Sequence, residues 1–157
     1  MNITQITPRQ AQQLCREITT TLPEWFGQPQ SNERYVKGML ERTSFAVQSG
    51  EPFVGLLALE FPFPNNANIY WMGVKPNYHG QGIGNALISA AEAYAGQQGA
   101  TTITVETLSP KASDEYYLKT FDFYCKVGFQ PLFELCPYGP EQPMVYMCKY
   151  LQSDITN

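Results

Sequence analysis

The fold prediction depends on one glycine-rich stretch in the middle of the chain, Val74-Lys75-Pro76-Asn77-Tyr78-His79-Gly80-Gln81-Gly82-Ile83-Gly84-Asn85-Ala86-Leu87. An apolar run ends where the stretch begins, glycines alternate at 80, 82 and 84, and an amphipathic pattern starts at the last of them. The stretch therefore predicts a strand, a turn and a helix N-terminus. Exposed N–H groups of such a turn, with the partial positive charge of the helix N-terminus, suit a phosphate or pyrophosphate.

Two other glycine motifs do not fit these residues. A dinucleotide-binding fingerprint requires a third glycine three residues after the second, where Asn85 stands. A P-loop requires Lys and Ser or Thr after its last glycine, but Gly84 is followed by Asn85-Ala86. The remaining alternative is a plain tight turn, which would not need three glycines that each cost backbone entropy.

Hydrophobic periodicity on both sides of the stretch predicts the other elements. Thr7-Pro8 is typical of a helix start, and Ser49-Gly50-Glu51-Pro52 of a hairpin turn. The order ααβββαβαββ predicts an α/β fold with a mixed sheet. Helices are expected after Thr7, after Ser31, at 83–94 and at 116–127, and strands at 44–48, 53–61, 69–74, 101–107, 131–135 and 144–151.

Length and composition limit the class of protein. The 157 residues suit a single domain over 1–157, and 43% apolar against 15% charged residues indicate a folded chain. Ten Lys and Arg against 14 Asp and Glu give a net charge of −4, which disfavours nucleic acid as a partner. Without a basic leader or a run of roughly 18 apolar residues, we expect a cytoplasmic protein with no membrane partner.

The four cysteines predict no metal site, because none belongs to a CxxC pair. Cys125, Cys136 and Cys148 follow apolar or aromatic neighbours. These surroundings predict buried, reduced thiols.

The glycine-rich stretch resembles the acetyl-CoA pyrophosphate loop of the GNAT N-acetyltransferase family, written Arg/Gln-x-x-Gly-x-Gly/Ala. This chain supplies Gly82 and Gly84, but its single histidine, His79, stands where Arg or Gln is usual. A surface histidine without a special role and a ligand or base both stay open for His79. The resemblance assigns seven loop residues to acetyl-CoA, namely His79, Gly80, Gln81, Gly82, Ile83, Gly84 and Asn85.

A second motif, Phe123-Tyr124-Cys125-Lys126-Val127-Gly128-Phe129, resembles the aromatic-rich helix with which the family ends in Gly-Phe. The resemblance implies that Tyr124 protonates the departing CoA thiolate, and a core aromatic is the alternative. Lys126 is a candidate for the 3′-phosphate of CoA, with a solvated lysine as the alternative. Tyr117 stands where many members have asparagine, and residues 106–116 form a longer stretch than usual. Both departures concern the pocket and leave the implied fold unchanged.

Both motifs and the element order, over nearly the whole chain, imply the GNAT fold, a mixed and mostly antiparallel central sheet with helices on both faces. The implied activity is transfer of an acetyl group from acetyl-CoA to a primary amine of a small molecule or peptide, through a tetrahedral intermediate and without a metal. In the family the strand before the loop pairs with the pantetheine arm, which implicates Met72, Gly73 and Val74. The Val74 N–H is the expected oxyanion donor. Gly73 fits a bulge or a close backbone approach, with simple relief of packing as the alternative.

The general base and the acceptor site are less specific. Glu106 and Glu60 end predicted strands and are candidate bases, each with a solvated strand-end carboxylate as its alternative. Trp25, Phe26 and Tyr138 lie in predicted loops that either line an acceptor pocket or cap the core. A non-catalytic acyl-CoA-binding or sensor module of the same fold remains the alternative function, and a homodimer is left open.

Overall fold

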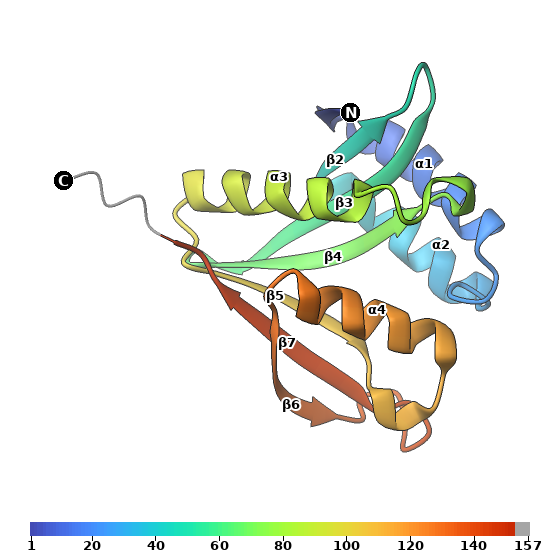
Figure 1. The fold of residues 1–157 in the computed structure, drawn as a ribbon, viewed down its shortest axis with the longest axis vertical. Helices are drawn as coiled ribbons and strands as arrows, with labels where there is room; N and C mark the ends of the chain where they lie inside the picture. The colour runs from blue at the N-terminus through green and yellow to red at the C-terminus, as the bar shows by residue number, and fades with distance from the viewer. Residues whose placement is uncertain (153–157) are drawn as a thin grey trace. The chain divides into compact units, whose positions relative to one another are not determined.

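The computed structural model describes residues 1–152 as a mixed α/β fold with a mostly antiparallel sheet, which confirms the predicted class (Figure 1). Within that range seven strands run in the order β1-β2-β3-β4-β5-β7-β6. The strands are β1 (Asn2–Ile6), β2 (Thr43–Gln48), β3 (Phe53–Phe63), β4 (Asn66–Val74), β5 (Thr102–Leu108), β6 (Gln130–Leu135) and β7 (Met144–Tyr150). The helices are α1 (Pro8–Thr21), α2 (Pro29–Gly38), α3 (Ile83–Gln97) and α4 (Glu115–Lys126), with 3₁₀ turns η1 (Met39–Glu41), η2 (Pro76–Tyr78) and η3 (Pro110–Ala112).

One strand, β1, was not predicted. It pairs antiparallel with β2, from Asn2 opposite Gln48 to Ile6 opposite Ser44. Of its five residues only Ile6 is buried, so the alternation of apolar and polar residues that identifies a strand is weak. The structure thus adds one edge strand before the predicted ααβββαβαββ order.

The chain divides into two compact units, and the first comprises residues 1–60 and 69–94. Helix α1 begins with a capping box, in which the Thr7 hydroxyl accepts from the Gln10 N–H and the Gln10 side chain accepts from the Thr7 N–H. Each bond satisfies an N–H that the helix itself leaves unpaired. Pro8 occupies the first helical turn, as the sequence predicted.

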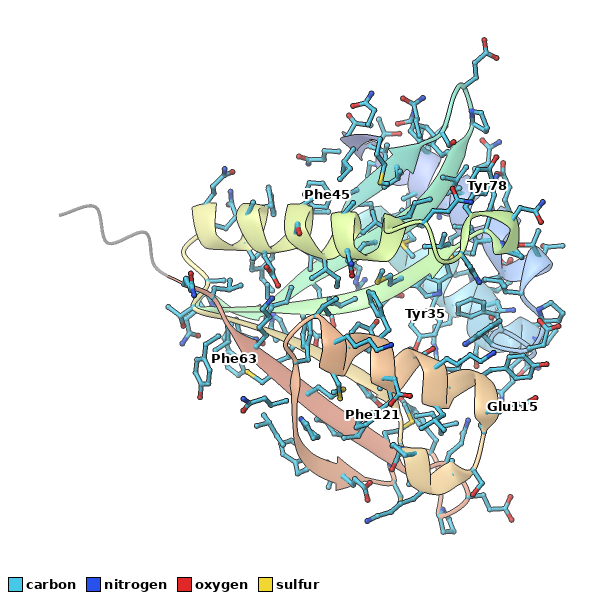
Figure 2. All side chains as sticks on the ribbon, viewed as in Figure 1. Tyr35, Phe45, Phe63, Tyr78, Glu115 and Phe121 are labelled. Atoms are coloured by element: carbon cyan, nitrogen blue, oxygen red, sulfur yellow. The ribbon has the colours of Figure 1, made fainter. Side chains whose placement is uncertain are left out.

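Helices cover both faces of the sheet in the first unit. Leu56 packs in a core cluster with Ile18 of α1. The neighbouring residue Gly55 faces the other way, because a Cβ there would lie 2.8 Å from Ile83 of α3. On that same side the ring of Phe45, labelled in Figure 2, lies 5.3 Å from the ring of Tyr94. Strand β3 is accordingly buried without interruption from Val54 to Leu59.

The second unit comprises residues 61–68 and the described residues from 95 onward. Its strand β5 alternates, with Ile103, Val105 and Thr107 buried and the residues between them half-buried. Helix α4 packs against β5 and buries Tyr124. Strand β5 therefore has one buried face and one partly accessible face.

The thiol prediction is wrong for two of its three residues. Cys148 on β7 is buried, but Cys125 on α4 and Cys136 after β6 are exposed. Apolar neighbours in the sequence do not report which side of a helix or loop a residue occupies, because burial depends on tertiary packing. Within residues 1–152, no helix combines the length and the apolar character needed to cross a membrane.

Candidate functional site

The glycine-rich stretch folds into the predicted strand, turn and helix. Strand β4 ends at Val74, η2 follows, and α3 begins at Ile83. Gly80 and Gly82 have φ angles of 73° and 80°, in the left-handed region that favours glycine. A Cβ at either position would meet no atom within 4 Å, so the space in front of the turn is open. The glycines are therefore required by backbone conformation, and the turn leaves room for a ligand beside a helix N-terminus.

The loop residues differ in what they can offer a ligand. Gly80, Gln81, Gly82 and Asn85 are exposed, whereas the Ile83 side chain is buried in the core. Ile83 can contribute only its backbone. Half-buried Tyr78, labelled in Figure 2, ends η2 at the entrance to this turn.

His79 closes the turn onto the strand before it. Its Nε2 atom lies 2.7 Å from the carbonyl oxygen of Val74. Since a carbonyl only accepts, the imidazole Nε2–H must donate this hydrogen bond. The ring of Trp25 meets the His79 ring edge-on, with centroids 6.0 Å apart. His79 thus has a structural contact on each side, a role that neither sequence alternative included.

The end of β4 is tightly packed at Gly73. A methyl group at this position would lie 2.6 Å from the Trp71 ring and 2.9 Å from Ile18. The close approach is thus made by core side chains, which favours the packing explanation for this glycine. Met72, Gly73 and Val74 are each half-buried.

Trp25 and Phe26 both pack against the core cluster of the first unit. The Phe26 ring stacks on Trp71 with centroids 5.2 Å apart, and its carbonyl accepts a hydrogen bond from the Asn32 side chain. Both aromatic residues keep partial exposure. Both rings thus contact the core, and Trp25 also contacts the glycine turn through His79.

Glu60 is engaged in an ion pair with Arg42. Arg42 Nη2 and Nε donate to the same Glu60 oxygen at 2.9 and 3.2 Å. The guanidinium also lies over the Tyr70 ring, 3.9 Å from its centroid. Both hydrogen bonds come from the guanidinium and are charge-assisted, so this Glu60 oxygen is occupied by Arg42 in the structure. Sequence reasoning did not identify Arg42, whose partner lies 18 residues away.

Tyr124, in the second unit, is 5% exposed and packs between the rings of Phe123 and Phe129. Burial, and after it the nearby Tyr117, raise the pKa of Tyr124 well above its ordinary value. The hydroxyl is therefore protonated at neutral pH and has a proton to donate.

Glu106, also in the second unit, has a buried carboxylate oxygen, Oε1, that no described residue hydrogen-bonds. Tyr146 stands directly opposite on β7. Burial, the Glu106 charge and a hydrogen bond to Glu106, in that order, raise the pKa of Tyr146. Tyr146 thus holds the Glu106 side chain, while Oε1 is buried without a hydrogen-bond partner among the described residues.

The predicted residues divide between the two units. The first holds the glycine turn, Met72–Val74, the aromatic loop and Glu60, and the second holds Tyr124, Glu106, Lys126 and Tyr138. Lys126 is exposed at the end of α4, and Tyr138 is 53% exposed in the β6–β7 loop. Among the described residues, no three His, Cys, Asp or Glu side chains gather as a metal site.

The sequence profile of the acetyltransferase (GNAT) family matches residues 11–123. The chain belongs to this family. No protein among curated sequences matches it in sequence. GNAT membership supports acyl transfer from an acyl-CoA as the class of reaction.

Solved structures share the GNAT fold over nearly their full length. A GNAT-family protein from Desulfovibrio desulfuricans is 16% identical with a TM-score of 0.81, covering 96% of this chain and 99% of that one. An aminoglycoside 6'-N-acetyltransferase complexed with coenzyme A is 19% identical with a TM-score of 0.74, covering 98% of each. The ribosomal-protein-S18-alanine N-acetyltransferase from Escherichia coli is 16% identical with a TM-score of 0.77, covering 99% of this chain and 97% of that one. At these identities the likeness shows the fold alone.

Proposed function

We propose that this GNAT protein transfers the acetyl group of acetyl-CoA to a primary amine of a small molecule or peptide. The observation that carries the proposal is the open, left-handed glycine turn that leads into α3. Its exposed backbone amides fit a pyrophosphate, because helix N-termini and successive N–H groups attract anions. Lys126 remains a candidate for the 3′-phosphate.

Three residues of the chain would then each assist one step of the reaction. Glu106 Oε1 accepts a proton from the acceptor ammonium, leaving a neutral amine that can attack. The Val74 N–H donates to the carbonyl oxygen as a C–N bond forms. Tyr124 donates its proton to the sulfur as the C–S bond breaks, and the nitrogen of the intermediate loses its second proton to water, which leaves the neutral amide. Water then reprotonates Tyr124 and takes the proton from Glu106, so each turnover releases one proton. Between the two predicted bases we favour Glu106, because Glu60 is committed to Arg42.

The test is to mix the purified protein with acetyl-CoA and a panel of amines, alcohols and thiols, following thiol release and product mass. We expect an N-acetylated product and thiol release that depends on the amine. Acetyl-CoA binding without product from any acceptor would favour the sensor module instead. Products from hydroxyl acceptors alone would contradict transfer to nitrogen.

A further inference from the structure

The partly accessible sheet face of the second unit carries a row of side chains whose positions follow from strand register. Glu106 on β5 stands opposite Tyr146 on β7, and Tyr146 stands opposite Phe133 on β6. The Tyr146 and Phe133 rings are stacked, with centroids 5.0 Å apart and planes 22° from parallel. The tyrosine ring therefore lies between the carboxylate and the phenylalanine ring.

The rows on either side of this one differ in polarity. On one side, Leu108, Met144 and Leu135 are aligned across the same three strands. On the other side, Thr104 Oγ1 donates to the Asn68 side chain at 2.8 Å. A ligand over Glu106 would thus meet an apolar strip on one side and hydrogen-bonded polar groups on the other.

Charge on this face has one sign. Glu106 is the charged member of the three rows, and none of them contains Lys or Arg. A buried carboxylate oxygen without a hydrogen-bond partner among the described residues favours a cation, since an anion would meet uncompensated repulsion. An aromatic face beside it adds attraction for an ammonium and packs against apolar groups.

We propose that Glu106, Tyr146 and Phe133 form an acceptor subsite that selects a primary amine with an aromatic or broad apolar body and no carboxylate. Glu106 receives the ammonium, the Tyr146 ring packs against the adjoining body, and Phe133 holds that ring in place. Phe133 is therefore a positioning residue, and its exposed side chain allows substitution without loss of the core. The inference rests on the proposed acetyl transfer for its kinetic consequences, but binding of the amine can be measured without turnover.

The experiment compares 2-phenylethylamine, ethanolamine and phenylalanine as acceptors for the whole protein with acetyl-CoA. We expect kcat/KM for 2-phenylethylamine to exceed that for each of the other two by about tenfold or more. Calorimetry with the same three compounds, without acetyl-CoA, reports their affinity independently of chemistry.

Two neighbouring exposed residues of β6 provide the matched variants. Phe133→Ala should raise KM for 2-phenylethylamine about five- to tenfold, with little change in kcat or in KM for acetyl-CoA. Leu132→Ala should change none of these, because Leu132 is 59% exposed and has no register partner on β7. Glu106→Gln should abolish amine binding in calorimetry, while Tyr146→Phe, which keeps the ring, should retain the preference for the aromatic amine.

The outcomes separate the two proposals. Turnover of all amines without aromatic preference, or equal effects of Phe133→Ala and Leu132→Ala, would overturn the subsite and leave acetyl transfer standing. Absence of turnover, with 2-phenylethylamine binding that Phe133→Ala weakens, would support the subsite and overturn the proposed function. Absence of amine binding to the wild-type protein would overturn the subsite.

Discussion

The sheet is built differently in the two units. In the first, β3 is buried on both faces, and residues that we propose for the site lie at strand ends and in the turn after β4. In the second, β5 alternates between buried and half-buried residues, and Glu106 occupies the middle of the strand. A strand covered on both sides has no place for an ionised group, whereas a strand covered on one side can carry one. The difference explains why the backbone groups that we propose for binding lie in the first unit, whereas the side chains that we propose for catalysis lie in the second.

The largest expected effect is a loss of turnover when Tyr124, on the buried side of the second unit, keeps its ring but loses its hydroxyl. Tyr124→Phe keeps the ring contacts with Phe123 and Phe129 but removes the hydroxyl. We expect turnover to fall about 10²–10⁴-fold, as for loss of a general acid, with acetyl-CoA affinity and stability nearly unchanged. Steady-state kinetics with a separate binding measurement checks this. Equal turnover of the two proteins would make Tyr124 a core aromatic only.

The next prediction compares the same substitution in the two kinds of sheet. Leu57 on β3 is fully buried, whereas Leu135 on β6 is 54% exposed. Leu57→Ala should lower the free energy of unfolding by about 2–5 kcal/mol, because it leaves a cavity. Leu135→Ala should change it by no more than about 0.5 kcal/mol. Denaturant titration of both variants provides the measurement, and similar losses would contradict the described difference in coverage.

A smaller effect is expected at the glycine turn. Gly82→Ala places a side chain at a φ of 80°, which should cost about 1–2 kcal/mol of stability and weaken acetyl-CoA binding. Gly96→Ala is the control, since Gly96 lies in α3 with no atom within 4 Å of its would-be Cβ. It should be neutral or stabilise by up to about 1 kcal/mol without affecting binding. Calorimetric titration that shows the same affinity for both variants would argue against the pyrophosphate assignment.

The smallest perturbation requires no substitution: the thiols of the native protein are labelled with a chemical reagent. Cys125 and Cys136 should react with a water-soluble disulfide reagent, while Cys15 and Cys148 should react only on unfolding. Burial raises the pKa of Cys15 to about 12, so its thiol also lacks the reactive thiolate form at neutral pH. Mass mapping after brief labelling should identify two modified cysteines. Modification of Cys15 under native conditions would show that the first unit opens readily.

The sequence correctly predicted structural features that depend on residues adjacent in the chain. Thr7-Pro8 predicted the start of α1, and alternating glycines predicted the turn before α3. It failed for β1, whose five residues include one buried side chain, and it could not locate Arg42 beside Glu60. Cross-strand partners depend on register, which a single sequence does not specify. The row that joins Glu106 to Phe133 therefore became visible only in the structure.

The closure of the glycine turn by its own side chains has a consequence for the kinetics of association. His79 donates to the Val74 carbonyl and Gln81 to the Asn77 carbonyl, so the turn is shaped within the free protein. A ligand that binds a preshaped loop loses little affinity to ordering it. Encounter, and not rearrangement, would then limit the on-rate. Binding would proceed in one exponential phase whose observed rate constant rises linearly with ligand concentration, without a plateau, from an intercept equal to the dissociation rate constant.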